Sequence, residues 1–192
     1  MTAILKVDTI QDTSGNNIIN ENANTVTIGK AGDTVNVVGT LQNNSSALVT
    51  GKVLQVVSTQ NITDFSTTST SFVDVTGATL TITPSSTSSK ILLLCNTNTY
   101  QNTFQAYYAL RWERDIGGSS TAFGDATYGQ TYARSAVAND FWGGVGMTYL
   151  DSPNTTSAIT YTVQASTASS GTMGFGVNSA NASNIFAIEI GA

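Results

Sequence analysis

The stretch Phe104-Gln-Ala-Tyr-Tyr-Ala-Leu-Arg-Trp-Glu113 decides the class of fold, because its side chains alternate in character over ten residues. One face carries Phe104, Ala106, Tyr108, Leu110 and Trp112, and the opposite face carries Gln105, Tyr107, Ala109, Arg111 and Glu113. A period of two residues is that of a β-strand with one buried face. We therefore predict a strand here, with Trp112 in a core.

Further strands are expected on both sides of this stretch, at the short spacing typical of a β-sandwich. The run Lys90-Ile-Leu-Leu-Leu-Cys95 is continuously apolar and fits a central strand. The turns are expected at residues 84–89 and 117–120, where Pro, Ser and Gly gather. The other predicted strands span 53–57, 72–75 and 78–82 on either side of Thr76-Gly77, 143–150, 157–165, 172–177 and 185–190. About eight strands over about 140 residues predict a jelly-roll-like β-sandwich knob at residues 53–192.

The composition agrees with an all-β fold. The 192 residues include 31 Thr, 21 Ser and 17 Asn, and only 10% are charged. Threonine favours strands because it is branched at Cβ, whereas Ser and Asn favour turns. No apolar run is long enough for a membrane-spanning helix or a secretory signal, so we expect no membrane insertion and no export.

Several classes of function are excluded or disfavoured by the same counts. The chain has no His and one Cys, which leaves no Ser-His or Cys-His pair, no intrachain disulfide and no Cys-rich metal site. The net charge of −5 disfavours a nucleic-acid partner. Cys95 ends an apolar run and is expected to be buried and inert. We predict no metal, no cofactor and no catalytic residue.

Residues 1–52 differ from the rest of the chain. All 16 aromatic residues and both prolines lie beyond residue 64, whereas aliphatic residues recur throughout the first segment. Such a segment has too little apolar area for a core of its own, yet it is too apolar for a disordered chain. We therefore predict an intertwined fibrous β-stem in which three chains share the burial, and hence a homotrimer.

A short internal repeat supports this stem. Thr25-Val-Thr-Ile-Gly29 is followed nine residues later by Thr34-Val-Asn-Val37, with a glycine-containing turn between them. Each half reads as a short strand, with Val26 and Ile28 or Val35 and Val37 facing inward. A single β-hairpin would give the same pattern.

The aromatic residues of the second part suggest a binding surface. Asn, Gln and Asp residues flank several aromatic residues that cannot all face one core, namely Tyr100, Tyr107, Tyr128, Tyr132, Phe141 and Trp142. We single out Tyr107, Tyr128, Tyr132 and Trp142 as candidate ligand-binding residues. Aromatic faces next to amides suit saccharide binding. Burial at a subunit interface, where Tyr and Trp are also enriched, is the alternative.

Paired carboxylates would be needed for glycoside hydrolysis. Glu113 falls on the polar face of its predicted strand near two arginines, and Asp115, Asp140 and Asp151 fall where turns are expected. A small glycan hydrolase that uses Glu113 and Asp125 is therefore the weaker hypothesis.

Two sets of stretches resemble tail-fibre proteins of marine bacteriophages. The first set is residues 5–19 and 25–35, and it is similar to the segment with which such fibres begin. The second set is residues 66–77, 84–91 and 150–161, and it is similar to a modular β domain at their distal end. These blocks cover less than a third of the chain, and no catalytic residue comes with the resemblance.

The resemblance implies a virion fibre, assembled in the host cytoplasm, that mediates adsorption to a host-surface saccharide. Its N-terminal segment would dock on other virion proteins of the tail or capsid. The chain is short for a tail fibre, so a head fibre, a capsid-decorating protein or a tail accessory protein is the alternative. A bacterial adhesin is a third hypothesis.

Overall fold

The computed structural model describes residues 42–43, 46–47, 52–61, 63–102, 106–134, 141–167, 171–176 and 183–191. The chain divides into two units, Met1–Val49 and Thr50–Ala192. In the first unit, β1 (Gln42–Asn43) pairs antiparallel with β2 (Ser46–Ala47). Val26, Ile28, Val35 and Val37 lie outside the described residues, so the stem, the trimer and a boundary at residue 52 stay predictions.

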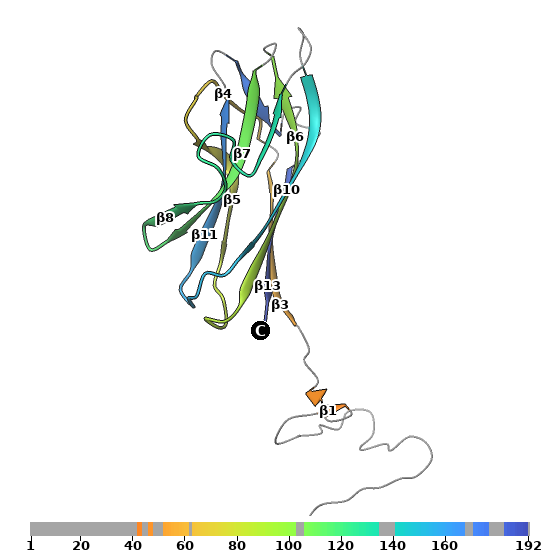
Figure 1. Cartoon of the computed structure of the whole chain (residues 1–192), viewed down its shortest axis with the longest axis vertical. Coiled ribbons are helices and arrows are strands. Elements are labelled where there is room, and N and C mark those ends of the chain that lie inside the picture. Colours follow the sequence, from red (N-terminus) through yellow and green to blue (C-terminus); the bar gives the residue numbers. More distant parts are fainter. Residues whose placement is uncertain are drawn as a thin grey trace, which may run out of the picture. The chain divides into compact units, whose positions relative to one another are not determined.

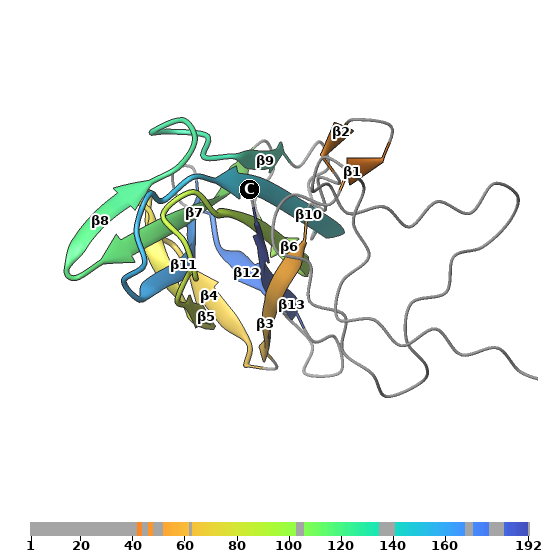
Figure 2. The same ribbon diagram turned by 90° about the horizontal axis from the view of Figure 1, so that it is seen from below.

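The second unit is a sandwich of two antiparallel sheets, which confirms the predicted all-β class (Figure 1). The β6 sheet contains β3 (Val53–Asn61), β4 (Phe65–Thr67), β6 (Lys90–Gln101), β10 (Phe141–Asp151), β12 (Met173–Phe175) and β13 (Ser183–Ile190). The β7 sheet contains β5 (Val73–Ile82), β7 (Tyr107–Ile116), β8 (Ser119–Ala122), β9 (Thr131–Arg134) and β11 (Ile159–Thr167). The view from below shows the two sheets as facing layers (Figure 2).

The two central strands are those that the sequence marks most clearly. β6 pairs with β10 along one edge and with β13 and then β12 along the other. β7 pairs with β11 on one side and with β8 and β9 on the other. The core lies between them and includes fully buried Trp112, Tyr108, Leu93 and Ile91.

One expected break is absent. The chain runs through Thr76-Gly77 as a single strand, β5, and both Val75 and Ala78 are buried in the core. Gly77 takes a φ of 81°, and the pairing with β11 shifts register between Thr162 and Gln164. The glycine therefore marks a β-bulge, which changes the inward parity of the strand without ending it.

The sandwich has two distinct ends. At one end, which we call the Lys52 end, the backbone N–H of Gly191 donates to the carbonyl of Lys52 at 2.9 Å. Because β6 pairs through Lys90 with Ile190, the start of β6 lies at this end too. Tyr100 and Trp142 pair near the other end of β6, which we call the opposite end.

Candidate functional site

The aromatic residues singled out by the sequence form two groups, not one. The rings of Tyr107 and Tyr128 lie 5.2 Å apart and those of Tyr128 and Tyr132 lie 5.1 Å apart, so these three form a tyrosine cluster. Trp142 instead lies against Tyr100, with ring centroids 4.7 Å apart. The cluster belongs to the β7 sheet, whereas the Tyr100–Trp142 pair belongs to the β6 sheet.

A rigid turn holds the tyrosine cluster in place. The carboxylate of Asp125 accepts hydrogen bonds from the backbone N–H groups of Thr127 and Tyr128, both at 2.8 Å. Asp125 and Gly129 also exchange two backbone hydrogen bonds of 2.9 Å. The loop thus presents Tyr128 to solvent, with an exposed fraction of 47%, and the neighbouring Tyr132 on β9 is 58% exposed.

The Tyr100–Trp142 pair borders a hollow of about 280 Å³, lined by Asn98, Thr99, Trp142, Gly143 and Gly144. Trp142 is 51% exposed, so much of its ring faces solvent. The Thr99 hydroxyl donates to the carbonyl of Gly143 at 3.0 Å and ties the two strands together beneath the hollow. An exposed indole, an amide and bare backbone therefore meet in one concave place.

The glycines of β10 keep this surface open. Gly144 pairs with Asn98 and Gly146 pairs with Asn96, all on the outer face of the sheet. A Cβ at Gly144 would lie 3.8 Å from the Asn98 Oδ1, and one at Gly146 would lie 3.2 Å from the Asn96 Oδ1. Because no side chain stands on β10 at these positions, the amides of β6 can be reached from the side of β10.

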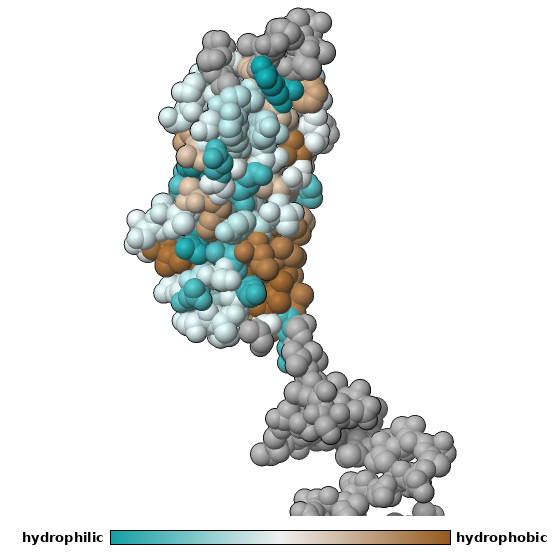
Figure 3. All heavy atoms as spheres, viewed as in Figure 1, coloured by the Kyte–Doolittle hydropathy of each residue, from teal (hydrophilic) through white to brown (hydrophobic). Residues whose placement is uncertain are grey.

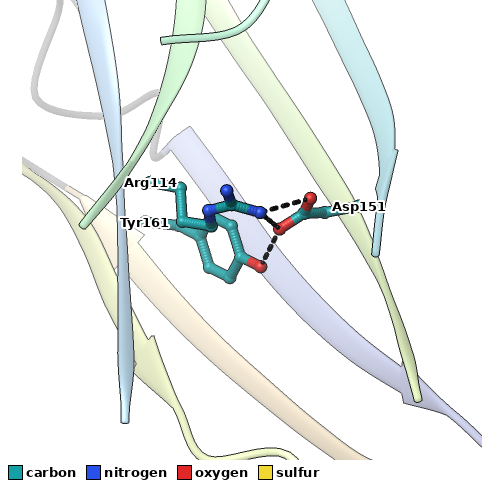
Figure 4. A network of polar contacts seen from close by, with 3 residues as sticks. All are labelled: Arg114, Asp151 and Tyr161. Carbon is teal, nitrogen blue, oxygen red and sulfur yellow. Dashed lines mark hydrogen bonds and ion pairs between the residues drawn. The ribbon is translucent and has the colours of Figure 1, made fainter. Parts of the chain in front are cut away.

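Asp151 has a structural role and is not in the turn that the sequence suggested. It ends β10, is 5% exposed, and accepts two hydrogen bonds from Arg114 Nη1 at 2.9 and 3.0 Å (Figure 4). The Tyr161 hydroxyl donates to the same carboxylate at 2.6 Å. Burial and this hydrogen bond raise the pKa of Tyr161. Asp151 therefore bridges the two sheets.

Three other acidic side chains are also engaged within the fold. Asp115 accepts from the backbone of Gly118 in the turn after β7, and Glu113 accepts from Gln164 at 3.0 Å. The hydrogen bonds from Tyr128 and then Thr127 lower the pKa of Asp125, which matches a turn-capping carboxylate. Asp140 lies outside the described residues.

Cys95 is buried as the sequence predicts, at 1% exposure, and burial raises the pKa of its thiol to about 12. Within the described ranges, no group of three or more His, Cys, Asp or Glu side chains could hold a metal ion. The same part of the chain contains no helix long and apolar enough to cross a membrane.

Sequence reasoning named both Tyr100 and Trp142 among the aromatic residues that one core cannot hold, but it did not pair them. It missed the part that Asn98 and the glycines of β10 play in the hollow. The alternation along β10 was readable, since residues 142, 144, 146 and 148 share one face of that strand. The pairing register of β10 on β6 was not readable, because the two strands lie about 40 residues apart in the chain and no turn fixes their alignment.

No family model matches this chain, and no curated protein matches it. Its fold is similar to that of chains in solved structures of infectious bursal disease virus. The Gx strain structure matches with a TM-score of 0.39 at 10% identity, over 82% of this chain and 45% of that one. The Gt strain structure matches with a TM-score of 0.35 at 13% identity, over 84% and 44%. The T13 viral particle matches with a TM-score of 0.34 at 11% identity, over 83% and 42%, so this chain spans less than half the length of each.

Proposed function

We propose that this chain is a non-enzymatic virion fibre of a bacteriophage, whose sandwich binds a host-surface saccharide during adsorption. The protein is a homotrimer, and its N-terminal segment docks on other proteins of the virion. The resemblance of the sequence to phage tail fibres supports a place in a bacteriophage virion. The hollow between β6 and β10 supports the binding role.

The hollow is the observation that carries this proposal. The exposed Trp142 offers a flat apolar face for a sugar ring, and Asn98 offers an amide that can donate to and accept from sugar hydroxyls. The volume of about 280 Å³ suits a small ligand with few contacts. Single-site binding would be weak, and three copies on one particle would raise the avidity.

The position of the hollow agrees with an adhesive role. It lies toward the end of the sandwich opposite Lys52, the residue through which the N-terminal segment joins. A ligand at that end does not compete for space with the point of attachment.

The engagement of the carboxylates supports a binding protein over a hydrolase. Asp151 is fixed by Arg114 and Tyr161, Asp125 caps its own turn, and Glu113 accepts from Gln164. A retaining or inverting glycosidase needs two carboxyl groups that face a common space.

The tyrosine cluster favours a second candidate function, a capsid or tail accessory protein that binds other virion proteins. Tyr128 and Tyr132 are exposed and held rigid, as aromatic residues at protein interfaces often are. In that case binding to isolated virions would depend on Tyr132 and not on Trp142.

Glycan-array and cell-adsorption assays of the full-length chain test these alternatives. We expect Trp142→Ala to lower saccharide binding at least tenfold. Thr148→Ala, on the same face of the same strand, serves as the matched control and should bind as the wild type does. Binding to capsids or tails but to no glycan or cell would overturn the adhesive role. Release of reducing ends from host polysaccharide would overturn the non-enzymatic role.

A further inference from the structure

The outer face of the β6 sheet changes character along its strands. Toward the opposite end it carries Asn96, Asn98 and the hollow. Toward the Lys52 end the cross-strand register places a row of four apolar side chains side by side, with two more in the adjacent row. We call these six the apolar face: Val56, Ile188, Leu92 and Leu150, with Phe186 and Leu94.

The two ends of the four-residue row are open to solvent, and the other four side chains of the apolar face are half-buried. Val56 is 56% exposed and Leu150 is 49% exposed, and both stand at the ends of the four-residue row. Val53 and Leu54, at the start of β3, are 63% and 41% exposed. Figure 3 shows a hydrophobic area in the lower part of the sandwich, where β3 and β13 run in Figure 1.

An apolar outer face is unusual for a sheet of this kind. Antiparallel sheets in sandwiches carry apolar residues on the core face and polar residues on the water face. Here β6 places Ile91 and Leu93 in the core and Leu92 and Leu94 on the outside. Contiguous exposed apolar patches larger than a few hundred Å² mark interaction sites.

We propose that the apolar face is where a second copy of this chain packs, so that the sandwiches of the homotrimer meet through their β6 sheets at the Lys52 end. The number of copies rests on the proposed function, whereas the face rests on its own side chains. In a three-fold arrangement the apolar faces would meet around a shared axis and bury their side chains against one another.

The charges on this face favour a copy of the same chain as the occupant. Among the outward-facing residues of β3, β6, β10 and β13, Lys90 alone is charged. None of the acidic residues that give the chain its net charge of −5 therefore stands on this face, and Lys90 at its margin is the one like charge that each copy would bring.

The chain that precedes β3 favours the same occupant. Residues 1–52 join the sandwich next to Val56 and lack the aromatic side chains that would cover a broad sheet face. If the copies meet here, their N-terminal segments start side by side, as an intertwined stem requires. The proposed stem and the apolar face then form one continuous interface.

The mass of the full-length chain in solution tests the proposal. Sedimentation equilibrium should give three times the 20.0 kDa chain for the wild type. Val56→Glu should weaken this association at least tenfold, because only the stem would then hold the copies together. Thr81→Glu, at an exposed position on the outer face of β5, is the matched control and should keep the wild-type mass. Because Val56→Glu could fail to fold, Val56→Thr with Leu150→Thr keeps the strand preference and should weaken association at least tenfold.

Crosslinking identifies the occupant directly. A photoreactive label on Ser58→Cys, next to the row, should join ¹⁴N and ¹⁵N chains in a mixed sample through peptides of β3, β6 or β13. Labelling stays selective because Cys95 is buried. Crosslinks confined to residues 1–51 of the same chain, or a wild-type mass of one chain, would overturn the proposal.

The two proposals fail separately. Trp142→Ala should lower saccharide binding at least tenfold and leave association of the chains unchanged, whereas Val56→Glu should weaken association and leave single-site binding in place. A trimer that Val56→Glu leaves as strongly associated as the wild type, and that still binds saccharide through Trp142, refutes the interface alone.

Discussion

The two sheets share one core but differ on their outer faces. On the β7 sheet, Thr79 and Thr81 stand opposite Thr162 and Thr160, with a hydroxyl–hydroxyl distance of 3.2 Å in each pair. On the β6 sheet, the equivalent outward positions near the Lys52 end are Val, Leu and Ile. Threonine has the branched shape of valine, so both faces suit a pleated strand equally well.

The choice of threonine on one outer face and of Val, Leu or Ile on the other is therefore explained by what surrounds each face, because strand preference is the same for both. The four threonines of the β7 sheet stand where that sheet meets water, and the sheet also carries a polar network there. Gln164 accepts from Arg111 at 2.8 Å and donates to Asp74 at 2.8 Å. The apolar face has no such network, which is the pattern of a covered surface.

The largest expected effect is on stability, and it comes from the contacts of Asp151 that join the two sheets. Asp151→Ala removes the acceptor of Arg114 and Tyr161 and leaves a largely buried guanidinium unpaired between the sheets. We expect a loss of about 3–5 kcal/mol in the free energy of unfolding. Denaturant unfolding at fixed protein concentration measures it. Asp115→Ala, in the turn after β7, is the control and should cost about 1 kcal/mol or less. Equal losses would show that the bridge does not hold the sheets together.

The next effect depends on pH and concerns the Lys52 end of the β6 sheet. Burial opposes ionisation of Glu189, but hydrogen bonds from Ser85 and Gln55 outweigh it and lower its pKa from 4.5 to about 2. The stabilisation is therefore complete above pH 4.5 and is lost as the pH falls toward 2. Glu189→Gln should cost on the order of 1–3 kcal/mol at pH 7 and less at pH 2.5. If the difference in unfolding free energy between the wild type and Glu189→Gln were the same at pH 7 and pH 2.5, the lowered pKa of Glu189 would be wrong.

A pair of substitutions compares the outer faces directly. Ile188→Thr makes the apolar face resemble the β7 sheet and should weaken association about tenfold, through the loss of roughly 1–2 kcal/mol of apolar burial. Thr162→Val makes the reverse change on β11 and should alter unfolding by only about 0.5 kcal/mol, with no change in mass. Sedimentation equilibrium and denaturant unfolding measure the two effects. If Ile188→Thr leaves association unaltered, a second copy of the chain does not cover the apolar face.

The smallest expected effect on stability comes from Gly144→Ala, which lies beside the hollow toward the opposite end of the β6 sheet. A Cβ at Gly144 meets only Asn98 Oδ1, at an ordinary 3.8 Å, so Gly144→Ala should change the free energy of unfolding by less than about 0.5 kcal/mol. The methyl group narrows the hollow, and saccharide binding should fall severalfold in a titration. Unchanged binding together with unchanged stability would place the ligand elsewhere.

Much of the fold was readable from local pattern, because alternation over a strand depends on neighbouring residues alone. The alternation around Trp112 predicts β7, and the run from Lys90 to Cys95 predicts the central β6. Gly77 was misread because a bulge and a break between strands share the same signal, a glycine inside a strand-like pattern. Asp151 was misread because the following Ser and Pro mark a turn, while its partners on β7 and β11 are distant in sequence.

The candidate site was only half readable for a related reason. Exposure of Trp142, Tyr128 and Tyr132 follows from the inability of one core to hold every aromatic side chain. Their division into two groups follows from sheet register, which local sequence does not encode. The apolar face needs the register of four strands at once, so no single stretch reveals it.

The placement of Lys52 and the hollow toward opposite ends of the sandwich has a mechanical consequence. In the proposed adhesive role, a tether at Lys52 and a ligand at Trp142 would pull along the strands, so that tension would reach β3 and its neighbour β13 lengthwise. The ladder between these strands is then loaded in shear, and its hydrogen bonds resist together instead of parting one after another. Shear loading of this ladder would help the sandwich to stay folded when a bound virion is pulled away from the host surface.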